Sequence, residues 1–159
     1  RLEHLHQGKF DAIILAAAGL NRLGYTEKVS EHFSVSDMLP AVGQGAIGIE
    51  SREHDASIEK LIAGLNHKPT AICVTAERAM SLTLEGSCEI PMAGYASLTG
   101  EQLQLRGLVA SWDGAEVVQD AVHGSAQDLL ALAIELGTEL GEQLLSRGAQ
   151  AILARSPKH

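Results

Sequence analysis

Three short runs in the second half of the chain are candidate strands, over residues 91–97, 102–110 and 116–123. In the middle run, Leu103, Leu105 and Val109 occupy alternate positions, which is typical of a strand with one buried face. Gly100 and Gly114 lie in the two short connections, within the pairs Thr-Gly and Asp-Gly that favour tight hairpins. The pattern predicts a three-stranded antiparallel sheet.

Helical spacing of apolar residues flanks this predicted sheet on both sides. One helix is predicted over residues 69–84, with Pro69 in its first turn, where proline is tolerated. Its apolar face carries Ile72, Cys73, Ala76, Ala79, Met80 and Leu84. A longer helix is predicted to begin at Ser125, with Asp128 in its first turn as a partial capping box. Its apolar face carries Leu129, Leu132, Ala133, Leu136, Leu140 and Leu144. The chain after Pro69 is therefore expected to form a compact α+β unit, with Cys73 in its core.

The first part of the chain has a different pattern. Residues 10–18 form a nearly unbroken apolar run, as in a strand buried on both faces of a parallel sheet. Weaker strands are predicted over residues 31–35 and 46–50, and a helix over residues 55–66. Residues 1–8 have the pattern of the last turns of a helix. Because these strands lack enough neighbours, we expect this part to belong to one or two larger α/β domains whose upstream half is missing.

The segment from Gly43 to Gly48 matches G-x-G-x-x-G, but its context does not fit a dinucleotide site. That fingerprint needs a strand before the glycines and a helix after them. Here the pattern after Ala46 continues as a strand. A dinucleotide-dependent oxidoreductase therefore remains an option only if a helix begins at Ala46.

Composition and charge limit the classes of partner. The formal net charge of −8 argues against binding to nucleic acid or to an anionic membrane, since both need clustered lysine and arginine. No apolar run approaches the ~18 residues of a membrane span. The two cysteines are too few for a disulfide framework, so we expect a cytoplasmic protein. The seven histidines show no metal-ligand spacing, and no metal site is predicted.

The loop between the predicted helix and sheet contains a single thiol, Cys88, between Gly86 and Pro91. Gly86 suits the residue after a helix end, and Pro91 prevents the helix from resuming. The loop alone does not establish a reactive group, because a lone cysteine is more often a small buried hydrophobe. The negative pole at the end of the preceding helix also disfavours a thiolate.

The chain resembles the hydroxymethylbilane synthase family, also called the porphobilinogen deaminase family. The matching stretches are residues 11–20, 22–24, 39–50, 65–67, 76–79 and 84–91. They follow one another in unbroken order along essentially the whole chain. Ser87 departs from the pattern, because the family usually has a second glycine there, and a small residue is still expected to fit.

The resemblance implies partial α/β domains of the periplasmic-binding-protein type, followed by a C-terminal domain of three-stranded antiparallel sheet with helices. Residues 1–40 would be the C-terminal part of the second α/β domain. Residues 41–67 would cross back into the first α/β domain and then form a linker. Residues 68–159 would form the C-terminal α+β domain, which carries Cys88. The missing N-terminal part of the same protein would complete the fold.

The resemblance also implies a transferase of tetrapyrrole (haem) biosynthesis. Porphobilinogen would be deaminated and added stepwise, through oligopyrrole intermediates, to a dipyrromethane primer held by Cys88 through a thioether, and linear hydroxymethylbilane would be released. Guanidinium groups suit the acetate and propionate arms of such chains. By matching motif positions, the other cofactor-binding residues would be Arg1, Arg22, Leu15, Ala16, Gly19, Gln44 and Gly45.

The family's catalytic aspartate would lie upstream of Arg1, so no catalytic residue is assigned in this chain. We therefore expect the isolated chain to be an inactive fragment of a monomeric enzyme. The alternative is a non-enzymatic module that binds an anion or another solute. A bare thiol at Cys88 would favour the module, and an added dipyrromethane mass would favour the synthase.

Overall fold

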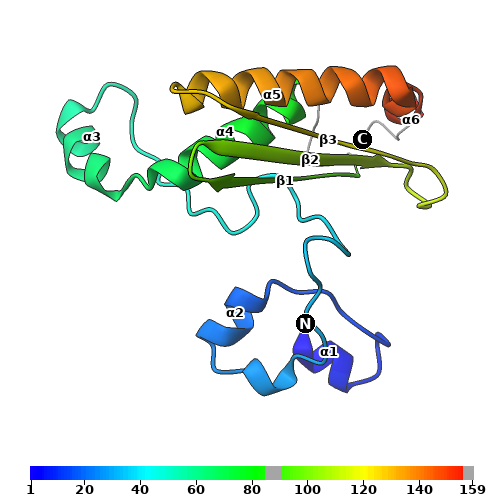
Figure 1. Cartoon of the computed structure of the whole chain (residues 1–159). Coiled ribbons are helices and arrows are strands. Elements are labelled where there is room, and N and C mark those ends of the chain that lie inside the picture. The colour runs from blue at the N-terminus through cyan, green and yellow to red at the C-terminus, as the bar shows by residue number, and fades with distance from the viewer. Residues whose placement is uncertain (85–90, 156–159) are drawn as a thin grey trace. The chain divides into compact units, whose positions relative to one another are not determined.

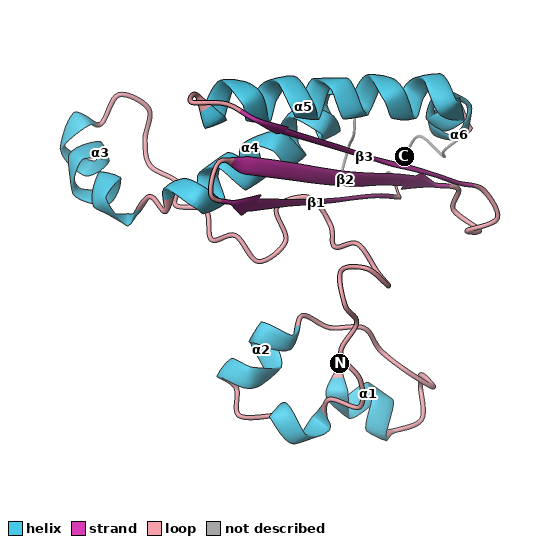
Figure 2. Cartoon of the chain, in the orientation of Figure 1, coloured by secondary structure: helices cyan, strands magenta, loops and turns pink. Residues whose placement is uncertain are grey.

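A computed structural model describes residues 1–84 and 91–155 of the chain. Cys88 and the predicted loop around it therefore lie outside the described residues. The chain separates into two compact units, Arg1–Ser34 and Val35–His159 (Figures 1 and 2). We describe each unit by itself. The predicted division into residues 1–40, 41–67 and 68–159 refers to the domains of a whole enzyme and stays a prediction.

The second unit is built on a three-stranded antiparallel sheet in the order β1-β2-β3. The strands are β1 (Met92–Thr99), β2 (Gln102–Ala110) and β3 (Val117–Ser125). Gly100 and Gly114 have φ values of 61° and 71°, which glycine adopts without strain at these turns. The predicted sheet is confirmed, and Leu103, Leu105 and Val109 are fully buried, as the alternation in the middle run indicates.

Two long helices, α4 (Lys68–Thr83) and α5 (Leu129–Leu144), cover one face of this sheet (Figure 1). A Cβ atom built on Gly107 of β2 would meet Met80 of α4 and also Leu140 of α5, so both helices lie on the same face. The predicted apolar faces of both helices supply most of the core. Cys73 packs against the edge of this core and is half-buried.

The two helices approach closely at two glycines of α5. A Cβ atom on Gly137 would meet the backbone oxygen of Ala76 and would lie 2.5 Å from Cβ of Ala79. A Cβ atom on Gly141 would lie 2.5 Å from Cβ of Thr83. Real side chains do not reach such distances without a shift of the backbone. The spacing between α4 and α5 therefore depends on the absence of side chains at these positions.

The start of α5 differs from the prediction. Asp128 is the N-cap, and its carboxylate accepts hydrogen bonds from the N–H groups of Leu130 and Ala131 at 3.1 Å. Ser125 is the last residue of β3 and does not open the helix. Aspartate at the N-cap satisfies two otherwise unpaired N–H groups, which explains why the helix begins after Asp128.

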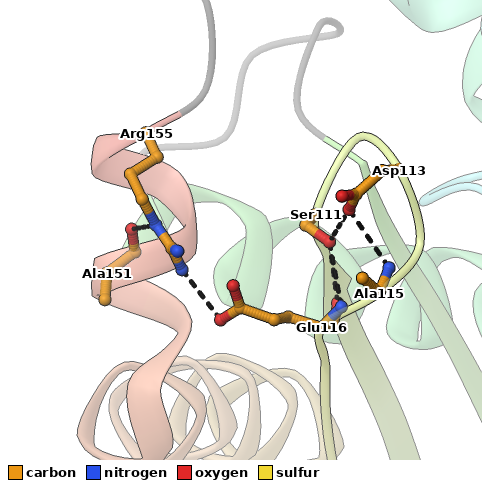
Figure 3. A network of polar contacts seen from close by, with 6 residues as sticks. All are labelled: Ser111, Asp113, Ala115, Glu116, Ala151 and Arg155. Carbon is orange, nitrogen blue, oxygen red and sulfur yellow. Dashed lines mark hydrogen bonds and ion pairs between the residues drawn. The ribbon is translucent and has the colours of Figure 1, made fainter.

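The last described helix of the second unit is α6 (Gln150–Ala154), which follows the segment η3 (Leu145–Ala149) with a kink at Gly148, where φ is 114°. Arg155 donates to the carbonyl oxygen of Ala151 at 2.9 Å and to the carboxylate of Glu116 at 2.8 Å (Figure 3). Glu116 ends the loop between β2 and β3, in which Ser111 donates to Asp113 at 2.6 Å. These contacts attach the end of the chain to the hairpin.

The first unit contains α1 (Leu2–His6), α2 (Ala17–Arg22) and the 3₁₀ turn η1 (Thr26–Lys28). The strands predicted over residues 10–18, 31–35 and 46–50 are wrong for this structure, because none of these described segments pairs as a strand. A parallel strand needs neighbours for its N–H and C=O groups, and the described part of the chain offers these segments none.

The predicted helix over residues 55–66 is confirmed as α3 (Ala56–Ile62) and the 3₁₀ turn η2 (Ala63–Leu65), with Asp55 as N-cap. Its apolar residues are not covered, since Leu61 and Leu65 are 76% and 67% exposed. Their periodicity indicates a helix with a buried face, and the described residues do not supply the surface that would bury it.

Candidate functional site

The first unit has an open hollow of about 930 Å³ on its surface. Apolar side chains form much of its wall, and its charged side chains are Arg1, Glu3 and Lys28. Lysine and arginine carry positive charge at neutral pH, so the lining has two cationic side chains and one carboxylate. The hollow is therefore suited to a ligand that combines apolar surface with carboxylates.

The predicted residues of the first unit lie at different places around α2. Arg1 and Leu15 line the hollow. Ala16 is the N-cap of α2, and Gly19 is an exposed residue within that helix. Arg22 is the last residue of α2 and is exposed, but it does not line the hollow. The structure thus brings two of these five predicted residues together.

The second unit has a hollow of its own, of about 440 Å³. Its walls are the turn at residues 40–46, the first half of α4 and strand β1. Gln44 and Gly45 both line it, as members of that turn. Gly43 and Gly45 have φ values of 71° and 84°, and the N–H of Ala46 donates to the oxygen of Gly43 at 3.1 Å. Glycine is needed here because other residues adopt such φ values only with strain.

The carboxylate of Glu77 connects the walls of this second hollow. Glu77 belongs to α4 and is only 6% exposed. Its Oε2 accepts from the N–H of Gly43 at 2.7 Å, and its Oε1 accepts from the N–H of Ala96 at 2.8 Å. Burial raises the pKa of Glu77, and the two backbone hydrogen bonds oppose that increase.

Cys73 lies one turn before Glu77 on α4 and lines the same hollow. Burial raises the pKa of this thiol, and the negative charge of Glu77 raises it further. Since the thiolate is the reactive form, this environment disfavours Cys73 as a nucleophile. The prediction that Cys88 is the anchoring thiol lies outside the described residues.

The two hollows differ in charge. The hollow of the first unit is lined by Arg1, Lys28 and Glu3, whereas the described lining of the second contains no lysine or arginine and includes Glu77. A ligand with several carboxylates matches the first hollow and would meet only neutral groups and a buried carboxylate in the second. Gln44 and Gly45 could therefore contact such a ligand through backbone and amide groups, but no lysine or arginine in this described lining would neutralise its carboxylates.

Two residues that line the hollows, Glu77 and Lys28, were not among those predicted from the sequence. Glu77 gives a signal in the sequence, because an acidic residue stands on an otherwise apolar helical stripe between Cys73 and Met80. A buried carboxylate needs hydrogen-bond partners, so its position predicts a contact without identifying the partner. Lys28 gives no such signal, because its local pattern is that of an ordinary surface residue.

Two other classes of site receive no support. The next helix after Gly43–Gly48 is α3, which begins at Ala56, so the condition for a dinucleotide site, a helix at Ala46, is not met. Within residues 1–84 and 91–155, no group of three or more histidine, cysteine or acidic side chains is placed to hold a metal ion. No helix in the same ranges has the length and apolar character needed to cross a membrane.

Two family models match the chain, and both describe one family. The model "Porphobilinogen deaminase, dipyromethane cofactor binding domain" matches residues 1–60, which include the hollow with Arg1 and Lys28. The model "Porphobilinogen deaminase, C-terminal domain" matches residues 71–146, which include the sheet and most of α4 and α5. Together the two models cover most of the chain. The cofactor of this family is dipyrromethane. The chain therefore belongs to the porphobilinogen deaminase family, a family of transferases with a role in tetrapyrrole biosynthesis.

Proposed function

We propose that this chain is the cofactor-carrying portion of a hydroxymethylbilane synthase. In this proposal the whole enzyme adds porphobilinogen units stepwise to a dipyrromethane that is attached to Cys88. The observation that carries the proposal is the cationic hollow within the residues matched by the cofactor-binding model.

The residues of the first hollow fit a dipyrromethane. This group combines two pyrrole rings with acetate and propionate arms, so it presents both apolar surface and negative charge. Arg1 and Lys28 would hold the carboxylates, and a guanidinium can grip a carboxylate through two hydrogen bonds. Leu15, Leu20 and Tyr25 would contact the rings. Arg22, which is exposed at the end of α2, is proposed as a further carboxylate partner.

Cys88 is proposed as the anchor because a thiol is the softest nucleophile among protein side chains. A thioether also resists hydrolysis, which suits a permanent attachment. When bound, the cofactor supplies a free pyrrole carbon to which the first substrate unit is joined. Cys73 is not an alternative anchor in this proposal, because both burial and Glu77 raise the pKa of its thiol.

No general acid or base is assigned in this chain. Glu77 is the buried carboxylate of the second hollow, but both of its oxygens already accept backbone hydrogen bonds. A proton-transfer group must reach the substrate, and Glu77 faces Gly43 and Ala96 instead. The chain's own residues would therefore bind and orient the pyrrole chain, and proton transfer would depend on the family's aspartate upstream of Arg1.

The intact mass of the purified protein tests the attachment. We expect an added dipyrromethane mass that maps to the peptide containing Cys88, together with a pyrrole colour with Ehrlich's reagent in acid. The Cys88→Ser variant should lose both signals, and the matched Cys73→Ser variant should keep them.

A bare thiol at Cys88 in the unsubstituted protein would contradict the proposal. That result would instead favour a non-enzymatic module that binds an anionic solute, a function that the cationic hollow with Arg1 and Lys28 also supports. Retention of the added mass in the Cys88→Ser variant would move the anchor to another residue.

A further inference from the structure

We propose that Glu77 is a positioning residue that clamps the turn at residues 43–45 and strand β1 onto helix α4. The inference rests on the proposed function, because it gives the clamp a role at the cofactor site. Gln44 and Gly45 belong to this turn, and α4 is the helix that precedes Cys88 in the sequence. Glu77 would thus fix the turn relative to the helix that leads to the anchor.

The clamp acts at the free edge of the sheet. Strand β1 pairs with β2 along one side only, because it is the first strand in the order β1-β2-β3. On its other side, the N–H of Gly94 donates to the oxygen of Pro40 at 3.0 Å, and the N–H of Ala96 donates to Glu77 at 2.8 Å. The segment around Pro40 and the carboxylate of Glu77 together take the place of a further strand. They satisfy edge groups that would otherwise be left unpaired.

The rest of the segment before the turn is attached to the same unit. The carbonyl oxygen of Val35 accepts from Arg106 of β2 at 3.1 Å. Val42 packs against the core, and its Cγ2 would lie 3.3 Å from a Cβ atom on Gly94. These contacts hold the chain before the turn, and Glu77 supplies the hydrogen bond to Gly43 within the turn itself. Residues 35–43 are therefore expected to move with the sheet and α4 as one body.

The geometry requires a carboxylate of this length. Two N–H groups point at two separate oxygens, and a glutamine offers one oxygen and one NH₂, which cannot accept the second hydrogen bond. Hydrogen bonds to an ionised acceptor are also stronger than neutral ones. Aspartate keeps the charge but is shorter by one methylene, so it cannot span from α4 to both Gly43 and Ala96.

The test compares Glu77→Gln with Glu135→Gln in the full chain. Glu135 lies on an exposed face of α5, so its variant makes the same change in charge away from the clamp. Amide hydrogen exchange is measured residue by residue, and the fraction of chains with the added mass at Cys88 is measured by mass spectrometry. Because glutamine keeps one acceptor oxygen, we expect at least one of the amides of Gly43 and Ala96 to exchange about tenfold faster in Glu77→Gln, while Leu105 in β2 is unchanged. The loaded fraction at Cys88 should fall in this variant and not in Glu135→Gln.

Unchanged exchange at both Gly43 and Ala96 in Glu77→Gln would overturn the clamp. An equal acceleration of all amides, Leu105 included, would also overturn it, because it would show a loss of global stability only. Normal loading at Cys88 despite faster exchange at Gly43 or Ala96 would overturn the positioning role. A bare Cys88 in the unsubstituted chain is the separate result that overturns the proposed function. If Glu77→Gln does not fold, Glu77→Asp is measured in the same way and is expected to release Gly43.

Discussion

At the scale of single residues, Glu77 is the clearest case of a polar group whose chemistry is decided by its surroundings. A buried carboxylate is costly unless its oxygens are hydrogen-bonded, and here Gly43 and Ala96 supply one N–H to each oxygen. The titratable side chains of Cys73 and Tyr95 line the same hollow as Glu77. Burial still dominates, so the pKa of Glu77 is raised in the folded chain.

This raised pKa gives a prediction for stability against pH. The folded state holds the proton of Glu77 more tightly than the unfolded state, so this group's stabilising contribution is full below the unfolded pKa of about 4.5 and is lost as pH rises through the folded pKa. Denaturant unfolding of the parent and of Glu77→Gln gives the free energy of unfolding of each protein. The measurement is repeated about every half pH unit between pH 4 and pH 7. The stability of the parent relative to the variant should decline as pH rises. A relative stability that increases with pH would show that the pKa is lowered instead.

At the scale of elements, the packing of α4 against α5 depends on glycines that have no part in the apolar stripe. Gly137 and Gly141 allow the backbones to approach where any side chain would collide with Ala76, Ala79 or Thr83. The apolar stripes explain why both helices cover the sheet, and the glycines explain how closely they pack. The sequence analysis identified the stripes and did not identify this close approach.

Substitution at Gly137 tests this packing. Gly137→Ala should lower the free energy of unfolding by about 1–3 kcal/mol, even though alanine favours helices, because the new methyl group would overlap with α4. Gly64→Ala is the matched control, since nothing lies within 4 Å of a Cβ atom at Gly64. The control should be neutral or slightly stabilising in denaturant unfolding. Equal effects of the two substitutions would argue against close packing at Gly137.

At the scale of the whole molecule, the two units differ in how much they bury. The second unit has a continuous core under its sheet, whereas α1 and α2 of the first unit contain no buried residue. Ile14 and Leu23 of the first unit are 65% and 69% exposed. Apolar runs of this kind are typical of strands and helices that are covered on both sides. The elements of the first unit therefore do not bury these apolar side chains by themselves.

A further prediction concerns the activity of the whole chain. We expect the purified 159-residue chain to form no hydroxymethylbilane from porphobilinogen, because no general acid or base is assigned in it. The assay measures product after incubation with porphobilinogen, and boiled protein serves as the control for the spontaneous reaction. Product formed above that control would show that the chain itself contains a catalytic group.

The local part of the fold could be predicted from the sequence because its signals are short in range. Each signal lies within a few residues along the chain. The signals are the alternation in 102–110, the hairpin glycines and the apolar stripes of α4 and α5. The start of α5 was placed at Ser125 and not after Asp128, because both residues suit an N-cap and only the extent of β3 decides between them. The strand predicted over residues 10–18 was wrong because a strand also depends on a partner, which a periodic pattern does not supply.

The sequence by itself thus determined the family, the sheet and its two covering helices. Cofactor binding by Arg1, Leu15, Gln44 and Gly45 stays a prediction, and the structure places the first two at one hollow and the last two at another. Only the tertiary structure decided that Lys28 joins Arg1 and that Glu77 reaches Gly43. The hydrogen bond between Glu77 and Gly43 joins positions 34 residues apart. Periodicity and local propensity carry no information over such a separation, because the contact exists only after the sheet edge and α4 have packed together.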